Sequence, residues 1–266
     1  MPKTRLGLAG FMLSCVMTAL MPAAAQADRE VDVELVLAVD VSGSMDMDEH
    51  QLQRQGYAAA FRHPGLIQVI QSGFHGRIAV TFYEWAGAEQ QVITIPWTEI
   101  HDAASAEAFA QQLLDQPRAW IRGTSISGAL MYGVTLFGGN GFTSNRQVID
   151  VSGDGANNRG IPVEKARDFV VSQGVTINGL PVMLKHNYDP YALNAYYKDC
   201  VIGGQGAFMI SVQDPEQWAG AIRRKLVKEI ASTDPLFVPA ASSFSYQKSD
   251  CMIGEKLRQR WLQESE

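Results

Sequence analysis

The chain has 266 residues, of which 46% are hydrophobic and 19% are charged, with 24 glycines, 11 prolines and 3 cysteines. This composition is typical of a globular protein and excludes a disordered chain, a collagen-like chain and a small disulfide-dense protein. The formal net charge of −6 argues against binding to nucleic acid or to an anionic membrane surface, because both need a basic face.

The first 27 residues have the organisation of a secretory signal peptide. Lys3 and Arg5 precede an uncharged run from Leu6 to Met21, and small residues flank the cleavage site after Ala27. The run is shorter than the ~20 residues that span a bilayer. We therefore expect a cleaved signal peptide at 1–27, export to the periplasm or the extracellular medium, and no stable membrane insertion afterwards. An N-terminal membrane anchor is the alternative interpretation.

Strand and helix patterns alternate along the rest of the chain. Leu35 to Val39 is continuously apolar, as in a strand that is buried on both faces of a sheet. In chain order, the expected elements are a strand at Val31–Val41, a helix at Met47–Phe61, strands at Arg77–Trp85 and Gln91–Ile95, helices at Ser105–Leu114 and Ser125–Phe137, a strand at Arg146–Ser152, a helix at Pro162–Gln173, strands at Val175–Leu180 and Ala207–Val212, and a helix from Asp214 to about Ile230. Pro96 is expected to stop the strand that starts at Gln91.

This order predicts a three-layer α/β domain over residues 28–232, with a mostly parallel sheet and helices on both faces. In such sheets the functional residues gather in loops at the carboxyl ends of the strands. Residues 233–266 are expected to form a linker and a short C-terminal helix with Ile253, Leu257 and Trp261 on one apolar face. We expect this helix to dock on the domain. A free helix that binds a partner is the alternative.

Two cysteines, Cys200 and Cys251, remain once the signal peptide with Cys15 is removed. Two thiols in an exported chain most simply pair, because the compartment oxidises them. Closing a loop of about 50 residues would stabilise the fold by roughly 4 kcal/mol in the chain-entropy model. We therefore predict a disulfide between Cys200 and Cys251.

Oxygen-bearing side chains recur in three of the expected loops. Asp40, Ser42 and Ser44 follow the first strand, Thr124 precedes a helix, and Asp154 follows the strand at 146–152. Carboxylates, hydroxyls and water are the ligands that a hard divalent cation such as Mg²⁺ or Mn²⁺ prefers. Each stretch alone could be an ordinary turn or helix cap. Together, in order and each at a strand end or helix start, they predict a metal site.

The same residues resemble the metal-ion-dependent adhesion site of von Willebrand factor type A domains, and the resemblance covers about residues 31–231. Several stretches are also similar to an uncharacterised bacterial family of secreted proteins with a type A-like domain. These stretches are Val39 to Ser44, Gly123 to Leu130, Val148 to Gly155, and Tyr196 to Phe208.

The resemblance implies roles for the site residues. Ser42, Ser44 and Thr124 would coordinate the ion directly, and Asp40 and Asp154 would hold it directly or through water. One coordination position would remain for an Asp or Glu of a protein partner. The resemblance also implies a Rossmann-like sheet of six strands, with one antiparallel edge strand at Gln91–Ile95.

The predicted function is therefore an exported, metal-dependent protein-binding domain of the adhesion or scaffold type, and not an enzyme. The sequence contains no Gly-x-Ser-x-Gly elbow, no His-Glu-x-x-His motif and no Gly-rich phosphate loop. Two alternatives stay open. One is a metal-assisted hydrolase with Asp46 or Asp154 as general base, and the other is a structural domain with an idle metal site.

Other conspicuous residues lie near the same loops. Asn157, Asn158 and Arg159 follow the Asp154 loop and fit either a ligand contact or turn chemistry. Glu84-Trp85 and Trp97 lie near strand ends, where we expect packing in the core or at the sheet edge.

Overall fold

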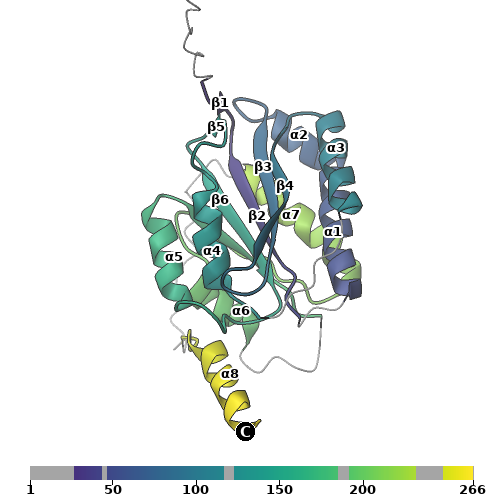
Figure 1. The fold of residues 1–266 in the computed structure, drawn as a ribbon. Helices are drawn as coiled ribbons and strands as arrows, with labels where there is room; N and C mark the ends of the chain where they lie inside the picture. Colours follow the sequence, from purple (N-terminus) through teal and green to yellow (C-terminus); the bar gives the residue numbers. More distant parts are fainter. Residues whose placement is uncertain (1–26, 44–46, 117–122, 185–191, 232–247, 266) are drawn as a thin grey trace, which may run out of the picture.

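The computed structural model describes residues 27–43, 47–116, 123–184, 192–231 and 248–265. Its central sheet has five strands in the order β4-β3-β2-β6-β7 (Figure 1). These strands are β2 (Glu34–Asp40), β3 (Ile78–Trp85), β4 (Gln91–Ile100), β6 (Gln147–Gly153) and β7 (Thr176–Pro181), while β1 (Arg29–Glu30) and β5 (Phe142–Thr143) form a separate short pair. Only β4 runs antiparallel to its neighbour in the central sheet.

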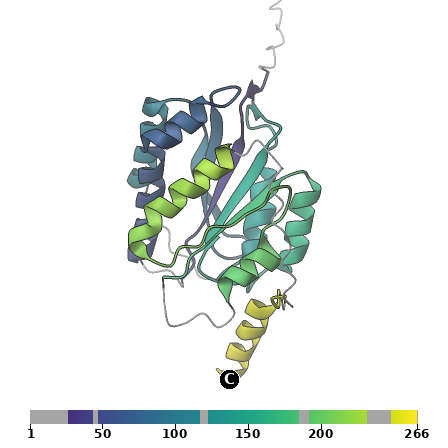
Figure 2. The same ribbon diagram turned by 180° about the vertical axis from the view of Figure 1, so that it is seen from behind.

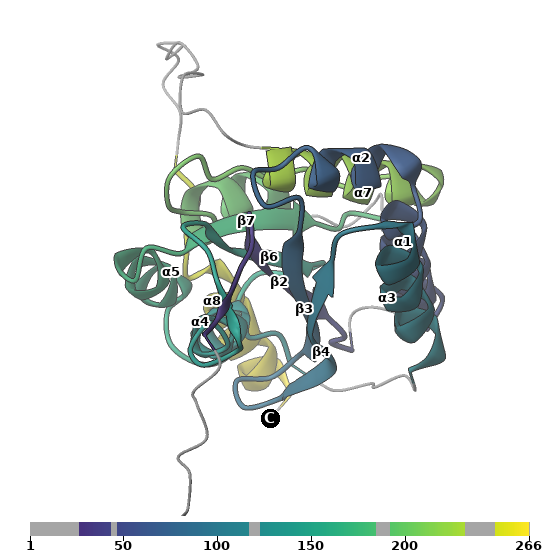
Figure 3. The ribbon, with the colours of Figure 1, turned by 90° about the horizontal axis from the view of Figure 1, so that it is seen from above.

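Helices cover both faces of the sheet (Figures 2 and 3). One face packs against α1 (Met47–Phe61), α2 (Pro64–Gln71), α3 (Ala103–Asp115) and α7 (Trp218–Ala231), and α7 follows the short 3-10 helix η2 (Pro215–Gln217). The other face packs against α4 (Ile126–Thr135), α5 (Val163–Ser172), α6 (Leu193–Tyr196) and the π-helical turn η1 (Tyr197–Val201). The predicted three-layer α/β fold is therefore confirmed.

The alternation of side chains along β2 explains its continuous apolar sequence. Leu35, Leu37 and Val39 belong to the core on the α1 and α7 side. Val36 and Ala38 belong to the core on the α4 and α5 side. Because successive side chains of a strand point to opposite faces, a central strand that is covered on both faces is apolar throughout.

The expected sixth strand, at Ala207–Val212, is not a strand, and the sheet has five strands instead of six. This segment lies parallel to β7 and forms two isolated bridges, Gly179 with Met209 and Val182 with Val212. Between the bridges stands Pro181, which has no N–H to donate. A ladder that loses this hydrogen bond is interrupted, so the segment occupies the sixth position of the sheet without strand geometry.

The prediction that Pro96 stops the antiparallel strand is wrong, because β4 continues through it to Ile100. The pairing of β3 with β4 shifts register between Val80 and Phe82, which places a bulge opposite the proline. The hydroxyl of Thr81 donates to the carbonyl of Ile95 at 2.8 Å. Proline is tolerated at edge strands and bulges, and β4 offers both.

The helix α2 and the α6–η1 segment were not expected from the sequence. Pro64 occupies the first turn of α2, and the His63 side chain accepts a hydrogen bond from the Gly65 N–H at 3.0 Å. Leu66 and Ile70 are four apart and both buried. Proline at a helix start followed by this spacing is the signal that could have found α2.

Several expectations fall outside the described residues, namely the signal peptide before Ala27, the linker up to Gln247, Ser44, Asp46 and Arg122. The last described helix, α8, spans Ile253–Glu264 and extends away from the α/β layers (Figure 1). Within the described ranges, none of the helices has the length and apolar character required to span a bilayer.

Candidate metal centre

The predicted site residues lie where the chain reverses its direction of travel across the sheet. Asp40 ends β2, and Asp154 follows β6, which is the parallel neighbour of β2. From β2 the chain first builds β3 and β4 on one side, and then β6 and β7 on the other. In open α/β sheets, ligands bind beyond the carboxyl ends of the strands at such a switch point.

Asp40 is a buried carboxylate with one oxygen that lacks a protein partner. Its side chain is 0% exposed, and Oδ1 accepts a hydrogen bond from the Ser42 N–H at 2.7 Å. Oδ2 is buried and has no hydrogen-bond donor within the described part of the chain. Burial raises the pKa of Asp40 well above its usual value, and the negative charge of Asp154 raises this pKa further. A cation at this position would reverse both effects.

Ser42 and Thr124 bring two hydroxyl groups together beside Asp40. The Thr124 hydroxyl donates to the Ser42 hydroxyl at 3.4 Å, and the two residues are 6% and 1% exposed respectively. Ser125 caps α4 by accepting a hydrogen bond from the Gly128 N–H at 3.0 Å. Thr124 is therefore fixed immediately before the first turn of α4, with its side chain directed at the β2 loop.

Asn158 holds the Thr124 loop against the loop that carries Asp154. The Thr124 N–H donates to Asn158 Oδ1 at 3.2 Å, and the Asn158 N–H donates to the Thr124 carbonyl at 2.9 Å. The sequence left open whether this asparagine contacts a ligand or forms a turn. The structure shows a residue that joins two loops of the candidate site.

Gly153 allows the close packing behind Asp40. A Cβ at this position would lie 2.9 Å from Asp40 Oδ2 and 3.0 Å from the Tyr197 hydroxyl. The Tyr197 hydroxyl donates to the Gly153 carbonyl at 3.4 Å. Only a glycine leaves room for the carboxylate and the phenol together.

The structure therefore brings Asp40, Ser42 and Thr124 into one cluster, and Asp154 lies close enough for its charge to act on Asp40. Ser44 lies outside the described residues, so its role stays a prediction. Among the described residues, no group of three or more His, Cys, Asp or Glu side chains could hold a metal. The donor set of carboxylate and hydroxyl oxygens around a partnerless buried oxygen fits a hard divalent cation.

Sequence reasoning missed Arg54 in α1, which organises the neighbouring strand end. Its guanidinium donates to Glu84 Oε1 from Nε at 2.9 Å and from Nη2 at 2.6 Å, and from Nη1 to the Gln116 carbonyl at 2.6 Å. Glu84 stands 30 residues away along the chain, so no local pattern indicates this pair. The adjacent Trp85 is 0% exposed and packs in the core, as expected.

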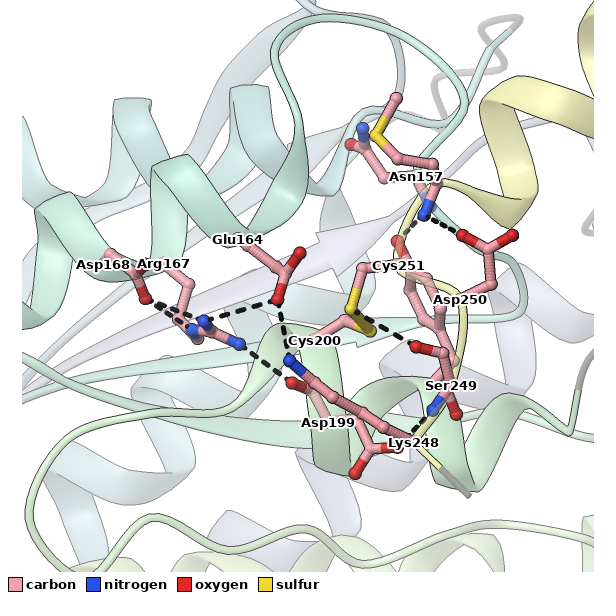
Figure 4. The surroundings of a disulfide bond; sticks show 12 residues. Asn157, Glu164, Arg167, Asp168, Asp199, Cys200, Lys248, Ser249, Asp250 and Cys251 are labelled. Atoms are coloured by element: carbon pink, nitrogen blue, oxygen red, sulfur yellow. Dashed lines mark hydrogen bonds and ion pairs between the residues drawn. A yellow bond between two sulfur atoms is a disulfide. The ribbon is translucent and has the colours of Figure 1, made fainter.

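The predicted disulfide between Cys200 and Cys251 is present, with Cα atoms 5.5 Å apart (Figure 4). It joins η1 to the start of the C-terminal helix. The helix therefore begins against the domain, while Trp261 on its second half is 66% exposed. The expected docking holds for the start of α8 but does not extend to Trp261.

Solved structures with a similar fold include three proteins of low sequence identity. Proximal thread matrix protein 1 from the mussel byssus is 12% identical, with a TM-score of 0.54, over 78% of this chain and 50% of that one. The pilus adhesin SpaC from Lactobacillus rhamnosus GG is 14% identical, with a TM-score of 0.54, over 77% and 31%. A von Willebrand factor type A protein from Catenulispora acidiphila is 13% identical, with a TM-score of 0.53, over 76% and 43%.

These likenesses establish the von Willebrand factor type A fold, and this chain spans half or less of each protein's length. Another structure of the mussel protein, with a TM-score of 0.52 and 12% identity, is described as having a zinc-occupied metal-ion-dependent adhesion site. No curated protein matches this chain. A family described as "Protein of unknown function (DUF1194)" matches residues 30–234. The chain therefore belongs to this family.

Proposed function

We propose that this chain is an exported protein-binding domain that captures a carboxylate of a protein partner through a divalent cation, Mg²⁺ or Mn²⁺. The cation would be held by Asp40, Ser42, Ser44, Thr124 and Asp154. The observation that carries the proposal is the Asp40 carboxylate, which is buried at the end of β2 with one oxygen that has no donor among the described residues.

The arrangement of the described residues supports this proposal in three ways. Asp40 and Asp154 concentrate negative charge that no Lys or Arg ion pair to Asp40 offsets among the described residues. The Ser42 and Thr124 hydroxyls are neutral donors only 3.4 Å apart. A site with few charged ligands leaves a bound divalent ion with residual positive charge, which suits an anionic group from outside.

When bound, the cation would supply a Lewis-acid anchor for an Asp or Glu side chain of the partner. The residues of this chain do the rest. Asp40 and Asp154 provide the charge, Ser42 and Thr124 fix the position, and the surrounding loops determine which partner fits. Adhesins and matrix proteins of the same fold make a protein partner the natural proposal.

Thermal unfolding of residues 28–266 in Mg²⁺, in Mn²⁺ and in EDTA tests the metal. A ligand that binds only the folded state at a hundredfold excess over Kd stabilises it by about 2.7 kcal/mol. We expect either ion to raise the midpoint of the wild type and not that of Asp40→Asn. Asp168→Asn, at a side chain that is 68% exposed on α5, is the matched control and should respond like the wild type. No rise in the wild type would indicate an idle site.

Water-proton relaxation of the Mn²⁺-loaded protein tests the open coordination position. A bound ion with an exchangeable water should enhance relaxation, and millimolar acetate should lower the enhancement by displacing that water. A panel of chromogenic phosphate and ester substrates tests for an enzyme. Metal-dependent turnover that Asp40→Asn abolishes would replace the binding function by a hydrolase.

Export to the periplasm or the extracellular medium is part of the proposal. The signal-peptide pattern before Ala27 and the Cys200–Cys251 disulfide support it, because disulfides persist in oxidising compartments. Fractionation of cells that express the full chain, together with the N-terminal sequence of the product, tests both export and cleavage.

A further inference from the structure

Asn157, on the loop between β6 and α5, uses the full hydrogen-bonding capacity of its side-chain amide. Oδ1 accepts from the Ser127 N–H at 2.9 Å, and Nδ2 donates to the Ile161 carbonyl at 3.2 Å and to Glu255 Oε1 at 2.7 Å. The residue is 0% exposed. Because the amide offers two donor hydrogens, both are occupied, and its carbonyl is tied to the first turn of α4.

The backbone of Asn157 is held as tightly as its side chain. Its N–H donates to the Tyr196 hydroxyl at 3.1 Å. On the other side, Gly254 packs directly against the Asn157 carbonyl, and a methyl group at position 254 would overlap that oxygen. The start of α8 therefore closes over Asn157 with both a glycine contact and a carboxylate hydrogen bond.

We call residues 248–255 the C-terminal clasp, because several contacts fasten this segment to the domain (Figure 4). The Cys200–Cys251 disulfide joins it covalently to η1. The Ser249 N–H donates to Asp199 Oδ2 at 2.7 Å, and Lys248 forms an ion pair with Glu164 at 3.0 Å. The matched family region ends at residue 234, so the clasp lies outside it.

The clasp reaches the candidate metal centre through two adjacent asparagines. Asn157 binds Ser127 in the first turn of α4, and Asn158 binds both backbone groups of Thr124. Beyond Leu257 the described residues of α8 are exposed, so the clasp is the buried part of the C-terminal segment. A change in the clasp would therefore be felt first at Asn157 and then at Thr124.

We propose that the C-terminal clasp, locked by the Cys200–Cys251 disulfide, positions Thr124 for metal binding, with Asn157 as the relay. The metal-binding part rests on the proposed function. The clasp residues are positioning residues, because none of them provides a ligand. Opening the disulfide should loosen the Thr124 loop and weaken metal binding without unfolding the domain, whose two cores are built almost entirely from residues before the clasp.

Four variants of residues 28–266 test this proposal. Glu255→Ala removes the acceptor for Asn157, whereas Glu255→Gln retains an oxygen in the same place. The double variant Cys200→Ser/Cys251→Ser opens the disulfide. Gln259→Ala changes an exposed residue one turn further along α8 and is the control. Amide hydrogen exchange of Thr124 and Ser127 in the metal-free protein reads the loop directly, and Mn²⁺ titration reads the site.

We expect Glu255→Ala and the double variant to speed Ser127 and Thr124 exchange by about fivefold, the size expected for losing one buried hydrogen bond. We expect their Kd for Mn²⁺ to rise by about tenfold, whereas Glu255→Gln and Gln259→Ala stay near the wild type. Unchanged exchange and unchanged Kd in the double variant would reduce the clasp to a stabilising cover. If the wild type binds no Mn²⁺, the proposed function fails, and the exchange rates alone decide whether the clasp positions Thr124.

Discussion

Lys225 on α7 and Asp150 on β6 form an ion pair inside the protein, with Nζ 2.6 Å from Oδ1 and both side chains 1% exposed. Glu229, one turn further along α7, pairs with the same ammonium and accepts a hydrogen bond from Asn178 on β7 at 3.0 Å. One buried cation thus faces two carboxyl groups. The cluster is neutral only when the two carboxyls share one proton.

The first prediction concerns the pH dependence of stability. Burial, and then the charge of Asp150, raise the pKa of Glu229 from 4.5 to about 7. Because this folded-state pKa lies above the ordinary value, the stabilisation is fully present below pH 4.5 and is lost as the pH rises through 7. We expect the free energy of unfolding, measured with urea, to fall by roughly 1–3 kcal/mol between pH 5 and 8.

Glu229→Gln should flatten this profile, because it removes the titrating proton and keeps an acceptor for Lys225 and Asn178. The other titratable groups that act on Glu229 include Arg146, whose guanidinium donates to the Glu229 carbonyl, and Tyr57, whose pKa burial raises further above its usual range. Both keep one charge state from pH 5 to 8. Parallel profiles for Glu229→Gln and the wild type would contradict the assignment.

The second prediction concerns the loss of the buried cation. Lys225→Met leaves Asp150 and Glu229 without their partner, so we expect a loss of about 3–5 kcal/mol in the free energy of unfolding at pH 8. Lys228→Met is the matched control, because Lys228 lies on the same helix, is exposed, and stacks on the Phe208 ring at 4.1 Å. It should cost at most about 1 kcal/mol.

The third prediction compares two Arg–Glu pairs that involve α1 or its end. Arg54→Met breaks the buried pair with Glu84, whose side chain is 5% exposed, and should cost about 3–5 kcal/mol. Burial already raises the pKa of Glu84, and without Arg54 this pKa should rise further, so the cost should be smaller at pH 5 than at pH 8. Arg62→Met breaks the exposed pair with Glu107 and should cost at most about 1 kcal/mol. Equal costs in urea unfolding would contradict this ranking.

The fourth prediction tests the close packing behind Asp40. Gly153→Ala places a methyl group 2.9 Å from Asp40 Oδ2, so the carboxylate must shift. We expect a rise of about tenfold in the Kd for Mn²⁺, measured by titration, together with a lower unfolding midpoint. Gly138→Ala is the control, because nothing lies within 4 Å of a Cβ there, and its Mn²⁺ affinity should equal that of the wild type.

The fold follows from the sequence wherever one residue pattern decides one element. Leu35 to Val39 is buried on both faces, and the helix Met47–Phe61 has its predicted bounds. The errors arise where a proline acts through its neighbour in space. Pro96 sits harmlessly at a bulge on an edge strand, and Pro181 interrupts pairing with a segment that lies well over 20 residues further along the chain.

The candidate site is predictable in its members and not in its supports. Asp40, Ser42 and Thr124 stand out because oxygen-bearing residues at strand ends form a local pattern, and the structure brings them together. Arg54 and Asn157 do not stand out, because their partners lie far along the chain. Glu255, the acceptor for the Asn157 side chain, is 98 residues away, and no local spacing encodes such a contact.

The interruption at Pro181 also bears on how the domain avoids self-association. The segment at 207–212 covers the outer side of β7, and at the opposite border β4 carries Pro96 and a bulge. Strand borders with continuous free hydrogen-bonding groups recruit other chains and lead to aggregation. In the described sheet one border is shielded and the other is broken at its middle, so two copies cannot extend it into a longer common sheet.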